Sequence, residues 1–82
     1  MKTVLYLREA QEALRRHTNV ASRLRKAMRE YAADPAAHGN NVTRLVGSSA
    51  KRLRVGSYRV IFEETDTEII VTRIAPRSSA YD

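Results

Sequence analysis

The stretch RLRVGSYRVIFEE, residues Arg52 to Glu64, decides how this chain is expected to fold. Its first half alternates arginines with apolar residues, a Gly-Ser break follows, and the second half is a nearly continuous apolar run. Alternation of this kind is typical of a strand with one face in a core and the other in water. We therefore expect two antiparallel strands, Lys51–Val55 and Tyr58–Glu63, joined by a tight turn.

A last strand is expected over Glu68–Ala75, after a turn at Thr65-Asp66. Strict alternation along this strand distributes the apolar residues over both faces, because one set is Ile69, Val71 and Arg73 and the other is Ile70, Thr72 and Ile74. The middle of the sheet therefore lacks a clean division into an apolar and a polar face.

The N-terminal half predicts a strand followed by two helices. Thr3–Leu7 is a short apolar run typical of a strand, and Arg8 to about Arg16 has helical spacing of its apolar residues. A break at His17-Thr18-Asn19 follows, and Thr18 or Asn19 is suited to cap a second helix. This helix carries an apolar stripe of Val20, Leu24, Ala27, Met28 and Tyr31.

The second helix is expected to end at Asp34, because a residue that precedes proline avoids the α region. Pro35–Asn41 has the composition of a loop, and Val42–Val46 leads from it to a turn at Gly47. The order strand, helix, helix, strand, strand, strand predicts a single α+β domain over residues 1–82. We expect a small antiparallel-dominated sheet of about four strands, with the two-helix hairpin on one face and the other face open.

Composition limits the classes of protein to which the chain can belong. The 82 residues are enough for one domain, and the absence of cysteine excludes disulfides and thiolate metal sites. Neither a signal peptide nor an apolar run of membrane-spanning length is present, so we expect a cytoplasmic protein without a membrane partner. The acidic residues and the two histidines have no metal-ligand spacing, and no motif predicts a cofactor.

Positive charge is concentrated in one part of the chain. The formal net charge is +6, and no acidic residue occurs between Asp34 and Glu63. This window contains five cationic residues: Arg44, Lys51, Arg52, Arg54 and Arg59. A cluster of one sign attracts a polyanion, although a solvated surface is the ordinary alternative.

Arginines together with a tyrosine are sufficient for one kind of metal-free chemistry. A guanidinium binds phosphate through two hydrogen bonds and stabilises the charge of a pentacoordinate transition state. A tyrosine close to positive charge has a lowered pKa and can accept a proton. RNA supplies its own nucleophile, the 2′-hydroxyl, so such a site is suited to cleaving RNA and poorly suited to DNA.

Two segments carry a resemblance to a known family. KRLRVGSYRVIFEE, followed by the C-terminal IIVTRIAPRSSAYD, resembles the toxin half of a RelE/ParE-type bacterial toxin–antitoxin pair. The helical hairpin ending in YAADP and the following NNVTRLVG extend the resemblance over nearly the whole chain. The resemblance implies a toxin that cleaves mRNA, commonly at the ribosomal A site, and that an acidic antitoxin neutralises in a heteromeric complex.

The resemblance also assigns roles by position. It implies that Arg59 and Arg77 hold the scissile phosphate and that Tyr81 accepts the proton or stacks on a base. The remaining cations would hold the flanking RNA: Lys51, Arg52 and Arg54, and in second rank Arg44 and Arg73. The C-terminal Pro76-Arg77-Ser78-Ser79 departs from the pattern, since relatives often carry a second basic residue or a His-Arg pair there.

Other interpretations remain open from the sequence. A ParE-like toxin of the same superfamily would poison DNA gyrase without cutting RNA, and a non-catalytic nucleic-acid-binding module would use the same charge. A third interpretation is an unrelated small domain whose arginines bind only a protein partner. Independently of these, the structural alternatives are a pairing of Arg59 with Glu63 or Glu68 across the hairpin and docking of the tail by Tyr81 as an apolar peg. Tyr31 and Tyr58 are expected to be packing residues.

Overall fold

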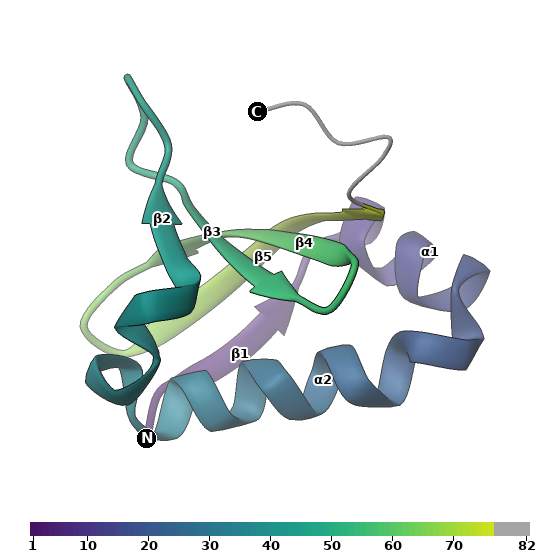
Figure 1. The fold of residues 1–82 in the computed structure, drawn as a ribbon, viewed down its shortest axis with the longest axis horizontal. Helices are drawn as coiled ribbons and strands as arrows, with labels where there is room; N and C mark the ends of the chain where they lie inside the picture. Colours follow the sequence, from purple (N-terminus) through teal and green to yellow (C-terminus); the bar gives the residue numbers. More distant parts are fainter. Residues whose placement is uncertain (77–82) are drawn as a thin grey trace.

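The computed structural model describes residues 1–76, apart from the side chain of Asn40. Its elements follow the order β1 (Thr3–Tyr6), α1 (Arg8–Arg16), α2 (Thr18–Ala33), η1 (Pro35–Asn41), β2 (Val42–Arg44), β3 (Lys51–Val55), β4 (Tyr58–Glu64) and β5 (Glu68–Pro76). The predicted α+β class and element order are confirmed (Figure 1). No helix in this part of the chain is long and apolar enough to cross a membrane.

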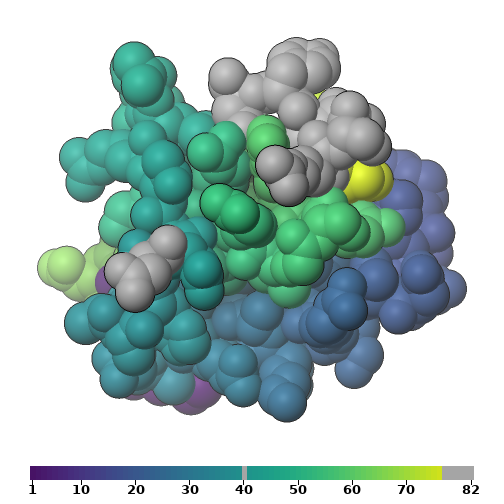
Figure 2. Space-filling view, in the orientation of Figure 1, coloured from purple at the N-terminus to yellow at the C-terminus, as the bar shows by residue number. Residues whose placement is uncertain are grey.

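The sheet in residues 1–76 has five strands, in the order β1-β5-β4-β3-β2, rather than about four. β1 pairs with β5 in parallel, and the other three pairings are antiparallel. The additional strand is β2, where Val42 pairs with Leu53 and Arg44 with Lys51. The segment that leads into the turn is therefore long enough to form an edge strand, and residues 45–50 project beyond it (Figure 2).

Two boundaries differ from the sequence prediction. A single residue, His17, separates α1 from α2, and no side chain caps α2, so neither Thr18 nor Asn19 has the predicted capping role. The predicted loop Pro35–Asn41 is a 3-10 helix with a kink at His38. Proline at the start of this helix favours it, because its ring fixes φ near the helical value.

The core lies between the helices and one face of the sheet. α2 runs beneath the strands in the view of Figure 1, and α1 covers the end of the same face. The predicted stripe is confirmed, because Val20, Leu24, Met28 and Tyr31 are buried and Ala27 is partly buried. From the sheet, the core receives Leu53, Val55, Val60, Phe62, Ile69, Val71 and Ile74. Within residues 1–76, no helix covers the other face of the sheet, which we call the open face.

A bulge in β5 resolves the mixed alternation of the last strand. Ile61 pairs with Arg73, but the next residue, Phe62, pairs with Val71, so Thr72 is an extra residue without a partner of its own. Its hydroxyl donates to the carbonyl oxygen of Ile61 at 3.2 Å. One extra residue reverses the faces of the following side chains. Ile74 therefore joins Val71 in the core, and Arg73 points to solvent.

This reversal predicts that replacing Ile70 or Ile74 by alanine changes the free energy of unfolding by unequal amounts, although strict alternation would place both side chains on the same face. We expect Ile74→Ala to lower the free energy of unfolding by about 2–3 kcal/mol, because it empties a buried site. Ile70→Ala, at a half-buried position on the open face, should cost about 1 kcal/mol. Urea unfolding measures both, and equal costs would contradict the bulge.

Candidate nucleic-acid interface

Four arginines occupy the open face of the sheet. Leu53 and Val55 of β3 point into the core, so Arg52 and Arg54, which alternate with them, point to the opposite side. By the same alternation, Val60 and Phe62 of β4 place Arg59 there, and the bulge places Arg73 there. We call Arg52, Arg54, Arg59 and Arg73 the arginine face.

The register brings these arginines together across three strands. Arg54 lies directly opposite Arg59 near the turn that joins β3 to β4. Ile61 lies between Arg52 on one side and Arg73 on the other. Directly opposed residues have Cβ atoms about 5 Å apart, and like charges at that spacing are destabilising. A cluster of charge of one sign also raises the local concentration of an anionic ligand.

The alternative pairing of Arg59 with Glu63 or Glu68 does not fit the register. Arg59 is the second residue of β4 and pairs with Ala75, whereas Glu63 lies near the other end of β4, opposite Ile70. Glu68 begins β5 and pairs with Thr3 of β1. The Glu63 carboxylate accepts a hydrogen bond from the Ser49 hydroxyl at 2.6 Å. The two acids therefore lie at the end of the sheet away from Arg59.

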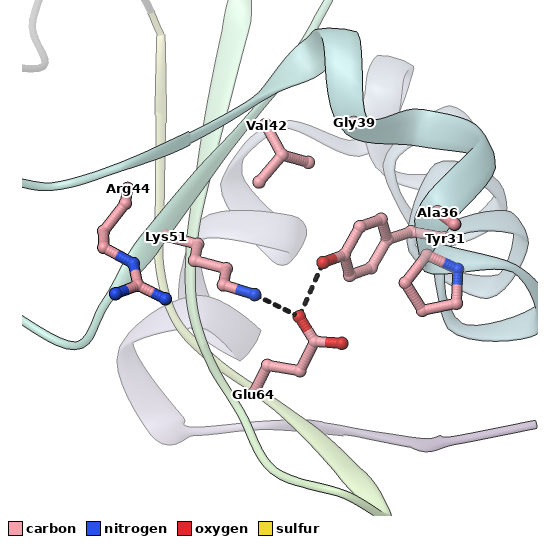
Figure 3. A pocket seen from close by; sticks show the side chains of 8 residues that line it. Tyr31, Ala36, Gly39, Val42, Arg44, Lys51 and Glu64 are labelled. Carbon is pink, nitrogen blue, oxygen red and sulfur yellow. Dashed lines mark hydrogen bonds and ion pairs between the residues drawn. The ribbon is translucent and has the colours of Figure 1, made fainter.

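Arg44 and Lys51 are placed apart from the arginine face. Arg44 on β2 pairs with Lys51 on β3. Lys51 comes directly before Arg52, which points to the open face, so Lys51 and its partner Arg44 point to the side of the helices. They line a cleft of about 370 Å³ with Tyr31, Pro35, Ala36, Gly39, Val42 and Glu64 (Figure 3). The sequence window of one-sign charge is thus divided between two faces of the sheet.

Glu64 forms the charged centre of this cleft. Its Oε1 accepts hydrogen bonds from the Tyr31 hydroxyl at 2.6 Å and from Lys51 Nζ at 2.9 Å, and its Oε2 accepts one from Lys2 Nζ at 2.7 Å. Figure 3 shows the Tyr31 and Lys51 side chains converging on this carboxylate. Because the donors come from β3, α2 and the N-terminus, one carboxylate fastens three separate parts of the chain to β4.

The protonation states of this cluster follow from its contacts. Burial by itself would raise the pKa of Glu64, but hydrogen bonds from Lys2, Tyr31 and Lys51, together with the Lys51 charge, lower it from 4.5 to about 2. Burial raises the pKa of the Tyr31 phenol, and the hydrogen bond and negative charge of Glu64 raise it further. Tyr31 is therefore a fixed donor in addition to the packing residue that the sequence predicted.

Sequence reasoning missed this cluster. Lys2 and Glu64 are 62 positions apart, and no local motif connects them. The only available signal was an acidic pair at the end of an apolar strand, which is common in solvated turns. Arg77 and Tyr81, the other two residues assigned to catalysis, lie outside the described residues. Within residues 1–76, no group of three His, Asp or Glu side chains is placed to hold a metal ion.

Comparison with known proteins identifies the family. The family profile described as ParE toxin of type II toxin–antitoxin system, parDE, matches residues 4–81. The chain belongs to this family. It is therefore the toxin component of a type II toxin–antitoxin system within the RelE/ParE superfamily, as the sequence resemblance indicated. A search of curated protein sequences finds no match.

Solved structures share the fold of this toxin. A chain of the archaeal RelE–RelB complex from Pyrococcus horikoshii OT3 is 23% identical, with a TM-score of 0.77, and the match covers 96% of this chain and 98% of that one. The intact E. coli RelBE toxin–antitoxin complex gives 18% identity and a TM-score of 0.74 over the full length of both chains. E. coli YafQ gives 12% identity and the same TM-score and coverage. At these identities the likeness concerns the fold.

The depressed pKa of Glu64 predicts how the stability of the toxin depends on pH. A carboxylate whose pKa is lowered on folding stabilises the protein above pH 4.5, and this contribution is lost as the pH falls toward 2. We expect Glu64→Gln to lower the free energy of unfolding by about 2 kcal/mol at pH 7, less than the full shift because both lysines are partly exposed. The difference from wild type should shrink steadily below pH 4.5.

Urea unfolding of both proteins between neutral and strongly acidic pH measures this difference. Glu63→Gln is the matched control, because Glu63 is the neighbouring acid on the open face and accepts only the Ser49 hydroxyl among the contacts described above. A difference between wild type and Glu64→Gln that stays constant with pH would contradict the account.

The opposed arginines predict a mutation that stabilises the protein. Removing the exposed Arg54 charge relieves the repulsion with Arg59, so Arg54→Gln should raise the free energy of unfolding by up to about 0.5 kcal/mol at low salt. Added salt should reduce the gain, because it screens exposed charges. Thermal unfolding at two salt concentrations measures this. A clear loss of stability would show that Arg54 has a structural role.

Proposed function

We propose that this toxin is a metal-independent endoribonuclease that cleaves mRNA at the ribosomal A site and so inhibits translation. The observation that carries the proposal is the arginine face, in which Arg54 and Arg59 oppose each other on the open side of the sheet. Two guanidinium groups at this spacing suit a phosphodiester, which carries one negative charge and presents oxygens to both. Arg52 and Arg73 extend the charge along the path of a strand of RNA.

The proposed reaction needs no group beyond the RNA and the protein. The 2′-hydroxyl oxygen attacks the neighbouring phosphorus, and the bond from phosphorus to the 5′-oxygen of the next nucleotide breaks. The products are a 2′,3′-cyclic phosphate and a 5′-hydroxyl. Arg59 and Arg77 stabilise the additional charge on the phosphorane, Tyr81 as the phenolate accepts the proton of the 2′-hydroxyl, and the leaving 5′-oxygen takes a proton from solvent water. Lys51 and Arg44 lie on the far side of the sheet and do not take part in this step.

An acidic antitoxin is the proposed partner. The structures from Pyrococcus horikoshii and E. coli that share the fold are complexes of RelE with RelB. The formal charge of +6 favours an acidic partner for this toxin as well. We infer a heteromeric toxin–antitoxin complex in the cytoplasm, where mRNA and ribosomes are found.

A second candidate function follows from the family itself. The matching profile carries the description of ParE, and the ParE-like branch is the one associated with poisoning of DNA gyrase. In that case the arginine face would bind protein or remain solvated, and Arg59 would not be needed for any cleavage. The two functions share the fold, so the same variants distinguish them.

Primer extension on a defined mRNA, during translation and on naked RNA, tests the proposal. We expect wild type to produce cuts and Arg59→Ala to reduce their rate by about 10²–10³-fold, because a charge-stabilising group is lost. Arg44→Ala is the matched control, since it removes one arginine from the opposite face, and it should stay within about threefold of wild type. End-group analysis should find the cyclic phosphate.

Cuts that require ribosomes would establish action at the A site. A folded wild-type protein that arrests growth but yields no cuts under either condition would contradict the nuclease proposal. That result, together with trapped gyrase–DNA complexes, would establish the ParE-like function instead.

A further inference from the structure

A half-buried aromatic pair joins the helices to the end of the sheet that carries Arg54 and Arg59. The Tyr58 hydroxyl and His17 Nδ1 lie 3.0 Å apart, within hydrogen-bond distance. The two rings also meet edge to face, with centroids 5.2 Å apart and planes at 72°. His17 is the single residue between α1 and α2, and Tyr58 is the first residue of β4. The sequence predicted a break between the helices at His17 and a packing role for Tyr58.

A second contact reaches the same end of the sheet. Gly56, in the turn between β3 and β4, has a φ of +60°, and a Cβ added there would lie 3.3 Å from a guanidinium nitrogen of Arg23 on α2. Arg23 therefore rests against this turn. The helices therefore approach this end of the sheet at two points, through the Tyr58–His17 contact and beside Gly56.

These contacts lie beside the pair of opposed arginines. The first two cross-strand pairs after the turn are Val55 with Tyr58 and then Arg54 with Arg59. The same end of β4 also pairs with β5, where Tyr58 lies opposite Pro76 and Arg59 lies opposite Ala75. Tyr58 lies next to Arg59 in sequence and points to the other face, so a bond at its hydroxyl restrains the backbone on which Arg59 stands.

We propose that His17 and Tyr58 are positioning residues, whose hydrogen bond holds Arg54 and Arg59 together as one phosphate-binding pair. The proposal rests on the proposed function only in taking RNA phosphate as the ligand. It does not require that the phosphate be cleaved. It assigns a role to the junction between the helices, which lies on the opposite side of the sheet from the RNA.

Binding of a short 2′-O-methyl RNA oligomer across a range of KCl concentrations tests this role. The oligomer has no free 2′-hydroxyl, so binding is measured without cleavage. We expect Tyr58→Phe to weaken binding about fivefold and to lower the slope of log K against log salt by about 0.7, the loss of one phosphate contact. His17→Leu should give the same change, and the double variant should be no worse than either single one.

Two controls separate positioning from general stability. Tyr31→Phe also removes a hydroxyl that is hydrogen-bonded to a neighbouring side chain, but at Glu64, and it should leave the salt slope unchanged. His17→Asn places an acceptor oxygen near the position of Nδ1 and should restore most of the affinity. Thermal unfolding checks that each variant is folded. If Tyr58→Phe does not fold, binding by His17→Leu alone tests the proposal.

The outcomes distinguish this inference from the nuclease proposal. Wild-type affinity and slope in folded Tyr58→Phe and His17→Leu would overturn it, as would a wild-type protein that does not bind the oligomer. A wild type that binds with the expected pattern but produces no cuts in mRNA would contradict the nuclease proposal and leave the positioning role standing.

Discussion

The alternation of side chains along β4 is the constraint on which both faces of this toxin depend. β4 pairs with β3 and with β5, and its inward residues Val60 and Phe62 are completely buried under the helices. Every inward residue of a strand requires an outward neighbour. The packing of Val60 and Phe62 against the helices therefore also determines that Arg59 points to the open face. The strand register then determines which arginines of β3 and β5 lie beside it.

Two pairs of opposed cations lie on opposite faces of the sheet, in different surroundings. Arg44 and Lys51 face each other on the side of the helices, where the Glu64 carboxylate binds Lys51 and offsets part of the charge. Arg54 and Arg59 face each other on the open side, at the end of the sheet beside the β3–β4 turn. In the proposed function, binding of RNA or an acidic partner to the open side would stabilise the folded protein by mass action.

Local patterns predicted the elements, and long-range contacts escaped prediction. The helical spacing of apolar residues predicted α1 and α2, and the alternation in β3 predicted the central hairpin. Each of these patterns depends on residues only a few positions apart. The face occupied by Arg73 and Ile74 could not be read, because the bulge at Thr72 depends on pairing with β4. Alternation within β3 places Lys51 beside Glu64 and on the opposite face from Arg52. The sequence prediction missed this because it treated all the cations between Asp34 and Glu63 as one surface. The Glu64 cluster joins residues that no sequence pattern connects.

The central claim is that the open face of the sheet, and no other basic surface of the described part, binds the RNA phosphates. The most direct measurement is an NMR titration of the ¹⁵N-labelled toxin with an uncleavable RNA. The account predicts shifts of the backbone amides and guanidinium signals of Arg52, Arg54, Arg59 and Arg73, with Arg44 and Lys51 unchanged. Shifts confined to Arg44, Lys51 and the cleft around Glu64 would contradict it.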